Sequence, residues 1–375
     1  MLCLPNQADA QRKNRKKADA KPSEVSLDAF SFRNVGPAFL SGRIAHIAVH
    51  PNNESVWYVA VGSGGVWKTE NAGTTWTPIF DDQSTYTTGC VAIDPSNPEI
   101  VWVGSGEKVG GRNVAYGDGV YRSTNGGKTW DNMGLKNSEH ISEIIVHPDN
   151  SDVVWVASQG PLWSKGGERG LYKTTNAGKS WNRVLGNDEW TGVTDIIIDP
   201  RNPSIIYAAT WDRHRTVAAL MGGGPGTAIY RSDDGGDNWI KLSNGLPKSN
   251  IGKIGITISP QNPDVVYAAI ELDRTKGAVY RSKDRGSSWK KMSNTVSGGT
   301  GPHYYQELYA SPHKFDRLYI MNVRVLTSED GGKTFVQLKE QDKHSDNHAI
   351  VFKKDDPNYI MLGTDAGIYE SFDLA

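Results

Sequence analysis

The sequence predicts an all-β fold, a seven-bladed β-propeller made of four-stranded antiparallel blades. Three observations predict it: a short motif recurs along the chain, a turn containing proline precedes each copy, and short segments rich in β-branched residues flank the turns. The motif returns at a near-regular spacing of roughly 50 residues, which is typical of a repeat architecture rather than of several unrelated domains.

The repeated motif has the form S/T-x-D/N-x-G-x-x-W, and we call it the Asp box after its third residue. The acidic or amide side chain can accept backbone N–H groups across a turn, the glycine can take a positive φ, and the tryptophan ring can pack on a sheet. We therefore expect the boxes to be structural hairpins between the third and fourth strands of the blades. The copies occupy residues 69–76, 123–130, 174–181, 232–239, 282–289 and 328–335, with Phe335 in place of tryptophan, and a seventh begins at 371.

The proline turns lie between apolar segments that are predicted to be the first and second strands of each blade. Residues 141–146 and 153–157 flank one turn, and residues 119–123 lead into an Asp box as a third strand. Proline and the Asn or Asp residues beside it suit such turns, because they preset φ or bond their own backbone. The seven turns contain Pro51, Pro95, Pro148, Pro200, Pro260, Pro312 and Pro357.

The last blade has three predicted strands and no fourth strand after its Asp box. We expect the N-terminal segment 30–35 to pair there and close the blade, which would remove an open sheet edge. Residues 30–375 are then the propeller, truncated before a further domain. The three strands are expected at about 349–352, 359–363 and 367–371.

Residues 1–29 are expected to lie outside the fold, as a signal-peptide remnant followed by a disordered basic linker. A short apolar start precedes Ala8-Asp9-Ala10, a pattern like a secretory cleavage site. The alternative is a disordered tail in which the pattern occurs by chance. The signal interpretation predicts a secreted or periplasmic protein.

Composition excludes several classes of function. Lys and Arg number 41 and Asp and Glu 42, so the net charge of −1 offers no global basic field for nucleic acid. No apolar run is long enough to span a membrane. The only cysteines, Cys3 and Cys90, do not suggest a disulfide framework. No cofactor is expected.

Candidate functional residues lie on the loops opposite the Asp boxes, which join the second strand to the third and the fourth to the next blade. Paired carboxylates there would suit glycoside hydrolysis, and Glu107, Asp118 and Asp365 are the catalytic candidates, with Glu271 and Glu307 also available. The alternative is that each is a solvated loop charge. The sequence does not give their separations, so no pair is selected.

The same loops carry aromatic and basic residues that could bind a ligand. Rings can stack on sugars, and cationic groups can hold carboxylates or hydroxyls. Packing that anchors the loops is the alternative. The alternating His344, Asp346 and His348 could ligate a metal ion, or could be a polar strand entry at the propeller mouth. The ligand-binding candidates are Trp190, Trp211, Arg213, His214, Arg215, His303, Tyr304 and Tyr305.

The Asp boxes resemble bacterial neuraminidase repeats. The proline turns at Pro203 and Pro263, with the Tyr-Lys/Arg-Ser/Thr runs into the boxes, resemble xyloglucanase-type glycoside hydrolases and sortilin-like secreted bacterial proteins over about residues 30–375. In the xyloglucanase type a catalytic Asp lies in a T-D-x-G-G motif of the first blade, and Ser63 stands at that position here. Residues 364–367 resemble the motif but belong to the seventh blade. Sialidases carry an Arg in an F/Y-R-I-P motif, and the Gly-Arg-Ile-Ala run at 42–45 makes Arg43 a further ligand-binding candidate.

This resemblance implies a secreted propeller that binds or hydrolyses an extracellular polysaccharide on its loop face. A non-catalytic module that binds a protein or peptide, or assists assembly, is the alternative. The expected partners are an extracellular glycan or polypeptide and a second propeller outside this chain, with no nucleic acid and no membrane span.

Overall fold

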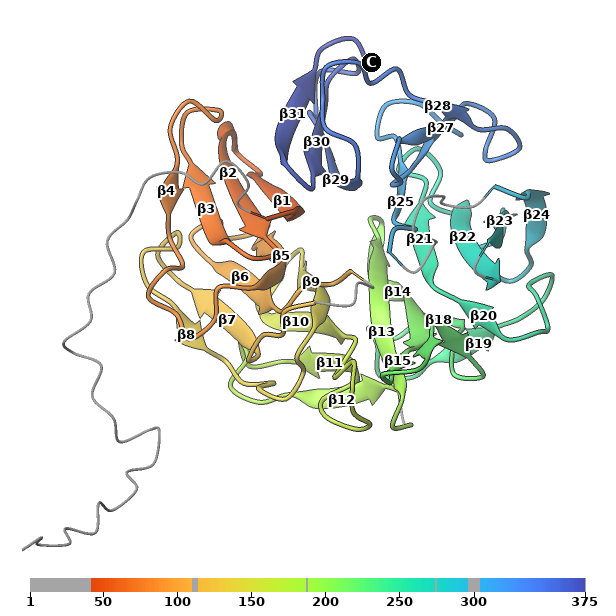
Figure 1. Ribbon diagram of the computed structural model, residues 1–375, viewed down its shortest axis with the longest axis horizontal. Coiled ribbons are helices and arrows are strands. Elements are labelled where there is room, and N and C mark those ends of the chain that lie inside the picture. The colour runs from red at the N-terminus through yellow and green to blue at the C-terminus, as the bar shows by residue number, and fades with distance from the viewer. Residues whose placement is uncertain (1–41, 110–113, 187, 274, 296–303, 375) are drawn as a thin grey trace, which may run out of the picture. The chain divides into compact units, whose positions relative to one another are not determined.

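The computed structural model describes residues 42–109, 114–186, 188–273, 275–295 and 304–374. These residues form strands and turns and contain no helix. Six antiparallel sheets of four strands and one of three strands follow one another along the chain (Figure 1). The predicted all-β, seven-bladed propeller is confirmed. Because none of the described residues is helical, none belongs to a helix that could cross a membrane.

The blades follow the chain in order, and each runs from its innermost strand outwards. Blade 1 contains β1 (Ile44–His50), β2 (Asn53–Val61), β3 (Gly65–Thr69) and β4 (Thr77–Pro78); blade 2 contains β5 (Thr88–Ile93), β6 (Val101–Ser105), β7 (Val120–Ser123) and β8 (Asp131–Asn132); blade 3 contains β9 (Ile141–His147), β10 (Asn150–Ser158), β11 (Gly170–Thr174) and β12 (Asn182–Leu185). Blade 4 contains β13 (Thr191–Asp199), β14 (Asn202–Asp212), β18 (Ile229–Ser232) and β19 (Ile240–Leu242).

Blades 5 to 7 repeat the pattern. Blade 5 contains β21 (Ile254–Ile258), β22 (Val266–Asp273), β23 (Lys276–Ser282) and β24 (Lys290–Ser293); blade 6 contains β25 (Leu308–Ala310), β26 (Leu318–Ile320), β27 (Leu326–Ser328) and β28 (Val336–Gln337); blade 7 contains β29 (Asn347–Phe352), β30 (Ile360–Thr364) and β31 (Gly367–Ser371). The segment 30–35, predicted to complete blade 7, lies outside the described residues.

Two short ribbons interrupt the repeat, and three of their four strands lie in the long loop of blade 4. Strand β15 (His214–Arg215) pairs with β16 (Leu220–Met221) and forms a hairpin. Strand β17 (Gly223–Gly224) pairs with β20 (Ile251–Gly252), which leads into blade 5. The longest loop between second and third strands is therefore built as a small structure of its own, tied to the next blade.

The core consists of apolar clusters between successive blades. Trp102 of blade 2, for example, is fully buried and meets the Asp-box ring of Trp181 from blade 3 edge to face, with centroids 6.2 Å apart. Ile44 of blade 1 packs with Ala349 and Met361 of blade 7, so the last blade follows round to the first. Burying such a side chain contributes about 1.5–3 kcal/mol, which makes each blade stable mainly through its neighbours.

The Asp boxes form the predicted hairpins. In the box of blade 2, Asn125 Oδ1 accepts the backbone N–H of Thr129 at 3.0 Å, and Ser123 Oγ accepts that of Gly127 at 2.8 Å. Gly127 has a φ of 88°, in the left-handed region. The indole nitrogen of Trp130 donates to the carbonyl oxygen of Ile79 in blade 1 at 2.6 Å. The box thus closes its own turn and ties two blades together.

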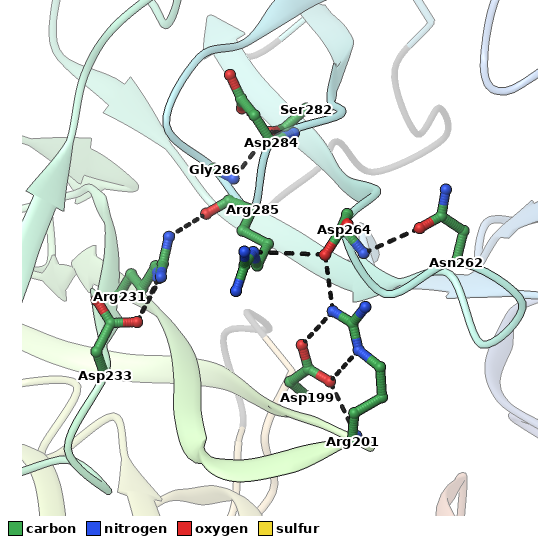
Figure 2. Close-up of polar contacts among 10 residues, drawn as sticks. All are labelled: Asp199, Arg201, Arg231, Asp233, Asn262, Asp264, Ser282, Asp284, Arg285 and Gly286. Atoms are coloured by element: carbon green, nitrogen blue, oxygen red, sulfur yellow. Dashed lines mark hydrogen bonds and ion pairs between the residues drawn. The ribbon is translucent and has the colours of Figure 1, made fainter.

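The Asp-box face between blades 4 and 5 is also held by ion pairs (Figure 2). The guanidinium of Arg201 lies 2.8 Å from the carboxylates of both Asp199 and Asp264, one from each blade. Arg285 also faces Asp264, with its Nε 3.4 Å from the carboxylate. Burial would raise the pKa of Asp199, but hydrogen bonds from Arg201 lower it on balance. These contacts give this face a structural role.

Replacing Gly127 by alanine should lower the free energy of unfolding by about 1–3 kcal/mol, since alanine is strained at this φ and its Cβ would lie 2.6 Å from Ile79 Cδ1. Gly166→Ala is the matched control, because Gly166 has a φ of 77° but open space around the added Cβ. Urea unfolding of both variants separates the clash from the strain of the backbone. Equal losses in the two variants would mean that the contact with Ile79 does not constrain the box.

Candidate functional site

The face opposite the Asp boxes brings together side chains from blades 1, 2 and 7 and from the loop that precedes blade 6. The antiparallel order of the strands places these loops away from the proline turns and the boxes. We call this group the mouth cluster. It consists of Arg43, Ser63, Glu107, Tyr304, Tyr305, Asp346, His348 and Asp365.

Arg43 stands between two carboxylates. Its Nη1 donates to Glu107 Oε2 at 2.6 Å, and its Nε lies 3.4 Å from Asp365 Oδ1. Ser63 Oγ donates to the other oxygen of Glu107 at 2.8 Å. The Glu107 side chain is 6% exposed, whereas Arg43 is 24% and Asp365 33% exposed. One carboxylate is therefore nearly enclosed and the other is open to solvent.

The two carboxylates have pKa values shifted in opposite directions. Burial raises the pKa of Glu107, although Arg43 and Ser63 oppose this shift. Burial would also raise the pKa of Asp365, but the hydrogen bond and charge of His348, together with Arg43, lower it on balance. Two carboxyl groups whose environments separate their pKa values are suited to an acid role and a base or nucleophile role.

Asp365 is positioned from behind by a histidine. His348 Nε2 lies 2.7 Å from Asp365 Oδ1, and the His348 side chain is 1% exposed. The ring of Tyr305 stacks on His348 with an interplanar angle of 15°, and its hydroxyl donates to Asp346. Tyr304 packs edge-on against both rings and lies under the guanidinium of Arg43. These rings fix the histidine and, through it, the carboxylate.

The alternating His344, Asp346 and His348 do not turn towards one another. His344 Nδ1 lies 2.6 Å from the backbone oxygen of Ser345, whereas Asp346 and His348 have the partners described above. Within the described ranges, no three His, Cys, Asp or Glu side chains form a group that could hold a metal ion.

Five of the predicted ligand-binding residues lie in or beside the long loop of blade 4. They are Trp190, Trp211, Arg213, His214 and Arg215. Trp211 is 1% exposed and donates from its indole nitrogen to Gly222 O at 3.0 Å. Arg213 packs on that ring and bonds the side-chain oxygen of Gln159, and burial lowers its pKa to about 9. The rings of Trp190 and His214 pack against each other at a tilt, with centroids 4.0 Å apart. Trp211 and Arg213 thus have partners in their own loop and in the neighbouring blade, and little exposed surface.

The remaining candidates are placed elsewhere. Asp118 accepts hydrogen bonds from Tyr121 and Ser84 and does not join the mouth cluster. Glu307 pairs with Lys253 at 2.8 Å. His303 lies outside the described residues.

The contribution of Ser63 to the site was missed from sequence. In the sequence it stands at the position of the catalytic Asp of the xyloglucanase motif, and in the structure its hydroxyl donates to Glu107 of the neighbouring blade. That coincidence with a catalytic motif position was the one available signal. For Asp346 and His348 the sequence left metal ligation and a polar strand entry at the propeller mouth as alternatives, and it did not indicate their contacts with Tyr305 and Asp365.

Comparison with known proteins gives two kinds of similarity. The Sortilin-Vps10 family model, described as sortilin, neurotensin receptor 3, matches residues 118–245. A probable oligoxyloglucan-reducing end-specific xyloglucanase of Neosartorya fischeri is 24% identical over 60% of this chain and 26% of its own length. The xyloglucanase Xgh74A of Acetivibrio thermocellus is 25% identical over 52% of the chain and 25% of its own length. The chain spans about a quarter of the length of these relatives.

Solved structures show the same architecture. The GH74 xyloglucanase of Xanthomonas campestris has a TM-score of 0.65 at 17% identity, covering 90% of this chain and 53% of that one. YCF48 of Cyanidioschyzon merolae has a TM-score of 0.59 at 15% identity, covering 90% of this chain and 97% of that one. The chain is an Asp-box propeller that resembles xyloglucanases and sortilin-like proteins, and it is glycoside-hydrolase-like in fold.

Proposed function

We propose that this protein is a secreted glycoside hydrolase that cleaves an extracellular polysaccharide at the mouth cluster. The observation that carries the proposal is the pair of carboxylates on either side of Arg43, with pKa values shifted in opposite directions. The xyloglucanases among the relatives support a β-glucan of the xyloglucan type as the substrate.

In this proposal Glu107 is the general acid, because burial favours its protonated form. It gives its proton to the glycosidic oxygen as the bond from that oxygen to the anomeric carbon breaks. Asp365 remains ionised and faces the positive charge that develops on the sugar ring. It then either removes a proton from the attacking water or bonds the anomeric carbon itself before water releases the sugar.

Arg43 and His348 position the two carboxylates. The charge of Arg43 lowers the pKa of Glu107 by less than burial raises it, so the pKa of Glu107 stays above its usual value. His348 Nε2 lies 2.7 Å from Asp365 Oδ1, the same oxygen that Arg43 Nε approaches at 3.4 Å. A sugar ring entering from solvent would meet Asp365 first, because this carboxylate is the more exposed of the pair.

The test is release of new reducing ends from a panel of plant and microbial polysaccharides that includes tamarind xyloglucan. Wild-type protein should release oligosaccharides from at least one member, and the Glu107→Gln/Asp365→Asn double variant should release none. Glu189→Gln, an exposed carboxylate on the same face, serves as the control for preparation-dependent contaminants. Release by the double variant, or no release by wild type from any member, would overturn the proposal.

A non-catalytic peptide-binding function is the second candidate. Two observations favour it. Ser63 stands where the xyloglucanase motif has a catalytic Asp. The structure of YCF48 bound to D1 peptide has a similar fold, and the match covers 88% of this chain and 93% of the YCF48 chain. Sensor-based screening of immobilised protein against an extracellular peptide library tests it. Peptide capture by protein inactive on every glycan would favour this candidate.

A further inference from the structure

A second cavity opens on the loop face, apart from the mouth cluster, where blade 4 meets blade 5. It has a volume of about 540 Å³, within the range of ligand pockets. We call it the hairpin pocket. One wall is the turn of the blade 4 hairpin, residues 216–220, and the other is the end of β22 with Glu271, Leu272 and Asp273. Gly223 and Gly252 of the β17–β20 ribbon lie between the walls.

Glu271 is an unusual carboxylate in this wall. It is 6% exposed, and its Oε2 accepts the backbone N–H of Lys253 at 3.1 Å. Among the described residues, Oε1 accepts no hydrogen bond and no cationic group reaches ion-pair distance. The ammonium of Lys253 is engaged instead by Glu307 and by the carbonyl oxygen of Tyr305. A buried carboxylate of this kind is costly to ionise unless a positive charge approaches it.

The β17–β20 ribbon packs closely against this carboxylate. A Cβ on Gly252 would lie 2.3 Å from Glu271 Oε2, so any larger residue would displace the carboxyl group. A Cβ on Gly223 would lie 2.4 Å from the carbonyl oxygen of Ile251. Glycine at 252 lets the ribbon approach Glu271 closely, glycine at 223 lets β17 approach β20, and all three residues line the cavity.

The other surfaces of the hairpin pocket suit an aliphatic stem. Ala218, Ala219 and Leu220 line the hairpin side, and Leu272 lies beside Glu271 on the opposite side. Asp273 adds a second carboxylate, and Arg215 is the cationic residue on the hairpin side. An apolar passage ending at a buried carboxylate complements a long side chain with a charged tip.

We infer that the hairpin pocket binds the side chain of a lysine or arginine presented by a polypeptide partner. The cationic tip would supply the counter-charge that none of the described residues gives Glu271 at ion-pair distance, and the methylene groups would lie against the alanine and leucine side chains. This inference does not depend on the proposed hydrolase activity, because it uses none of the mouth-cluster residues.

The affinity should depend on pH. The pKa of Glu271 is raised to about 7, chiefly by burial and in smaller part by Asp273, against the lowering effect of the Lys253 backbone bond and the Lys253 charge. Arg215, which carries a positive charge, lines the opposite side of the pocket. A lysine side chain also stays protonated below pH 9, so binding should strengthen as pH rises from 6 to 8 and Glu271 ionises.

The experiment compares two fluorescent pentapeptides that differ only at the central residue, lysine in one and norleucine in the other. Fluorescence anisotropy with the full chain should show binding of the lysine peptide, with a dissociation constant at least tenfold lower than that of the norleucine peptide. Glu271→Gln, which keeps the acceptor for Lys253 N, should remove this preference. Glu189→Gln should retain it, since that exposed carboxylate lies outside the pocket.

A second variant keeps the inference testable if Glu271→Gln folds poorly. Ala219 is exposed on the hairpin, so Ala219→Trp should fold and fill the pocket, and it should also abolish binding. Equal binding of the two peptides, an undiminished preference in Glu271→Gln, or no binding by wild type at pH 8 would each overturn the inference. Loss of glycan hydrolysis in the mouth-cluster variants would leave it untouched.

Discussion

Replacing Asp365 by asparagine is expected to lower the turnover of the glycan substrate by about 10²–10⁴-fold, the range for removal of an acid–base group. The variant keeps the size of the side chain but loses the negative charge that faces the sugar ring. His348 can still bond the amide oxygen, so the position of the group should be preserved. The loss should therefore appear in kcat with little change in KM, measured by initial rates on the polysaccharide identified in the screen.

The companion variant Glu107→Gln should behave differently with an activated substrate. An aryl glycoside whose phenolate leaves without protonation does not need the general acid. Glu107→Gln should therefore lose activity on the polysaccharide but retain most of its bond-cleaving activity on the aryl glycoside, whereas Asp365→Asn should lose both. If the two variants respond alike to both substrates, the assignment of separate roles is wrong. Glu189→Gln should match wild type throughout.

The pH dependence of kcat/KM should be bell-shaped, with its limbs set by the same pair. Because the pKa of Glu107 is raised, its acid form persists above the usual range, and activity falls as pH rises through that pKa. Because the pKa of Asp365 is lowered, its ionised form persists in acid, and activity falls only as pH drops through that lower pKa. Glu107→Gln should lose the alkaline limb on the aryl glycoside. An unchanged alkaline limb in that variant would contradict the assignment.

The repeat made the fold predictable from sequence. Each Asp box contains a turn, a positive-φ glycine and a packing aromatic, all of which act over eight residues or with the adjacent blade. Ser123, Asn125 and Gly127 make the contacts that these residue types predict. Strand lengths were less predictable: β10 begins at Asn150 because its pairing with β9 continues up to the turn, beyond the apolar run from 153.

The mouth cluster was predictable only as a set of residue types. Several of its members come from blades 1 and 7, which are distant in sequence. These blades meet because the seventh lies beside the first, as the packing of Ile44 against Ala349 shows. Glu107 and Asp118 belong to the same loop, yet Glu107 accepts a hydrogen bond from Arg43 and Asp118 accepts one from Tyr121. That choice depends on the path of the loop backbone, which spacing along the sequence does not encode.

Aromatic and basic loop residues have a similar ambiguity. Trp211 and Arg213 have the composition of a ligand site, but the blade 4 loop folds over them and pairs with β20. Arg169 ends the loop of the preceding blade, and the sequence does not distinguish it, since a single arginine before a strand is commonplace. In the structure it is 1% exposed and organises that loop.

Replacing Arg169 by methionine is expected to lower the free energy of unfolding by about 3 kcal/mol or more, because several buried carbonyl groups would lose their donor. Its guanidinium donates to the backbone oxygens of Gln159 at 2.8 Å and Ser164 at 2.8 Å, and also to those of Pro161 and Gly166. Burial lowers its pKa to about 10, so it remains a cation at neutral pH. Methionine fills similar space but provides no N–H group.

The loss should be local before it is global, since the carbonyls belong to one loop between β10 and β11. Hydrogen exchange should show residues 159–168 opening first, while urea unfolding reports the total change. Arg183→Met, at an exposed position on the outer strand of the same blade, is the matched control and should change stability by less than about 0.5 kcal/mol. Equal stability of the two variants would mean that water replaces the guanidinium at little cost. A large loss in Arg169→Met alone would show that this loop, and with it the rim beside Trp190, is held from inside by one buried cation.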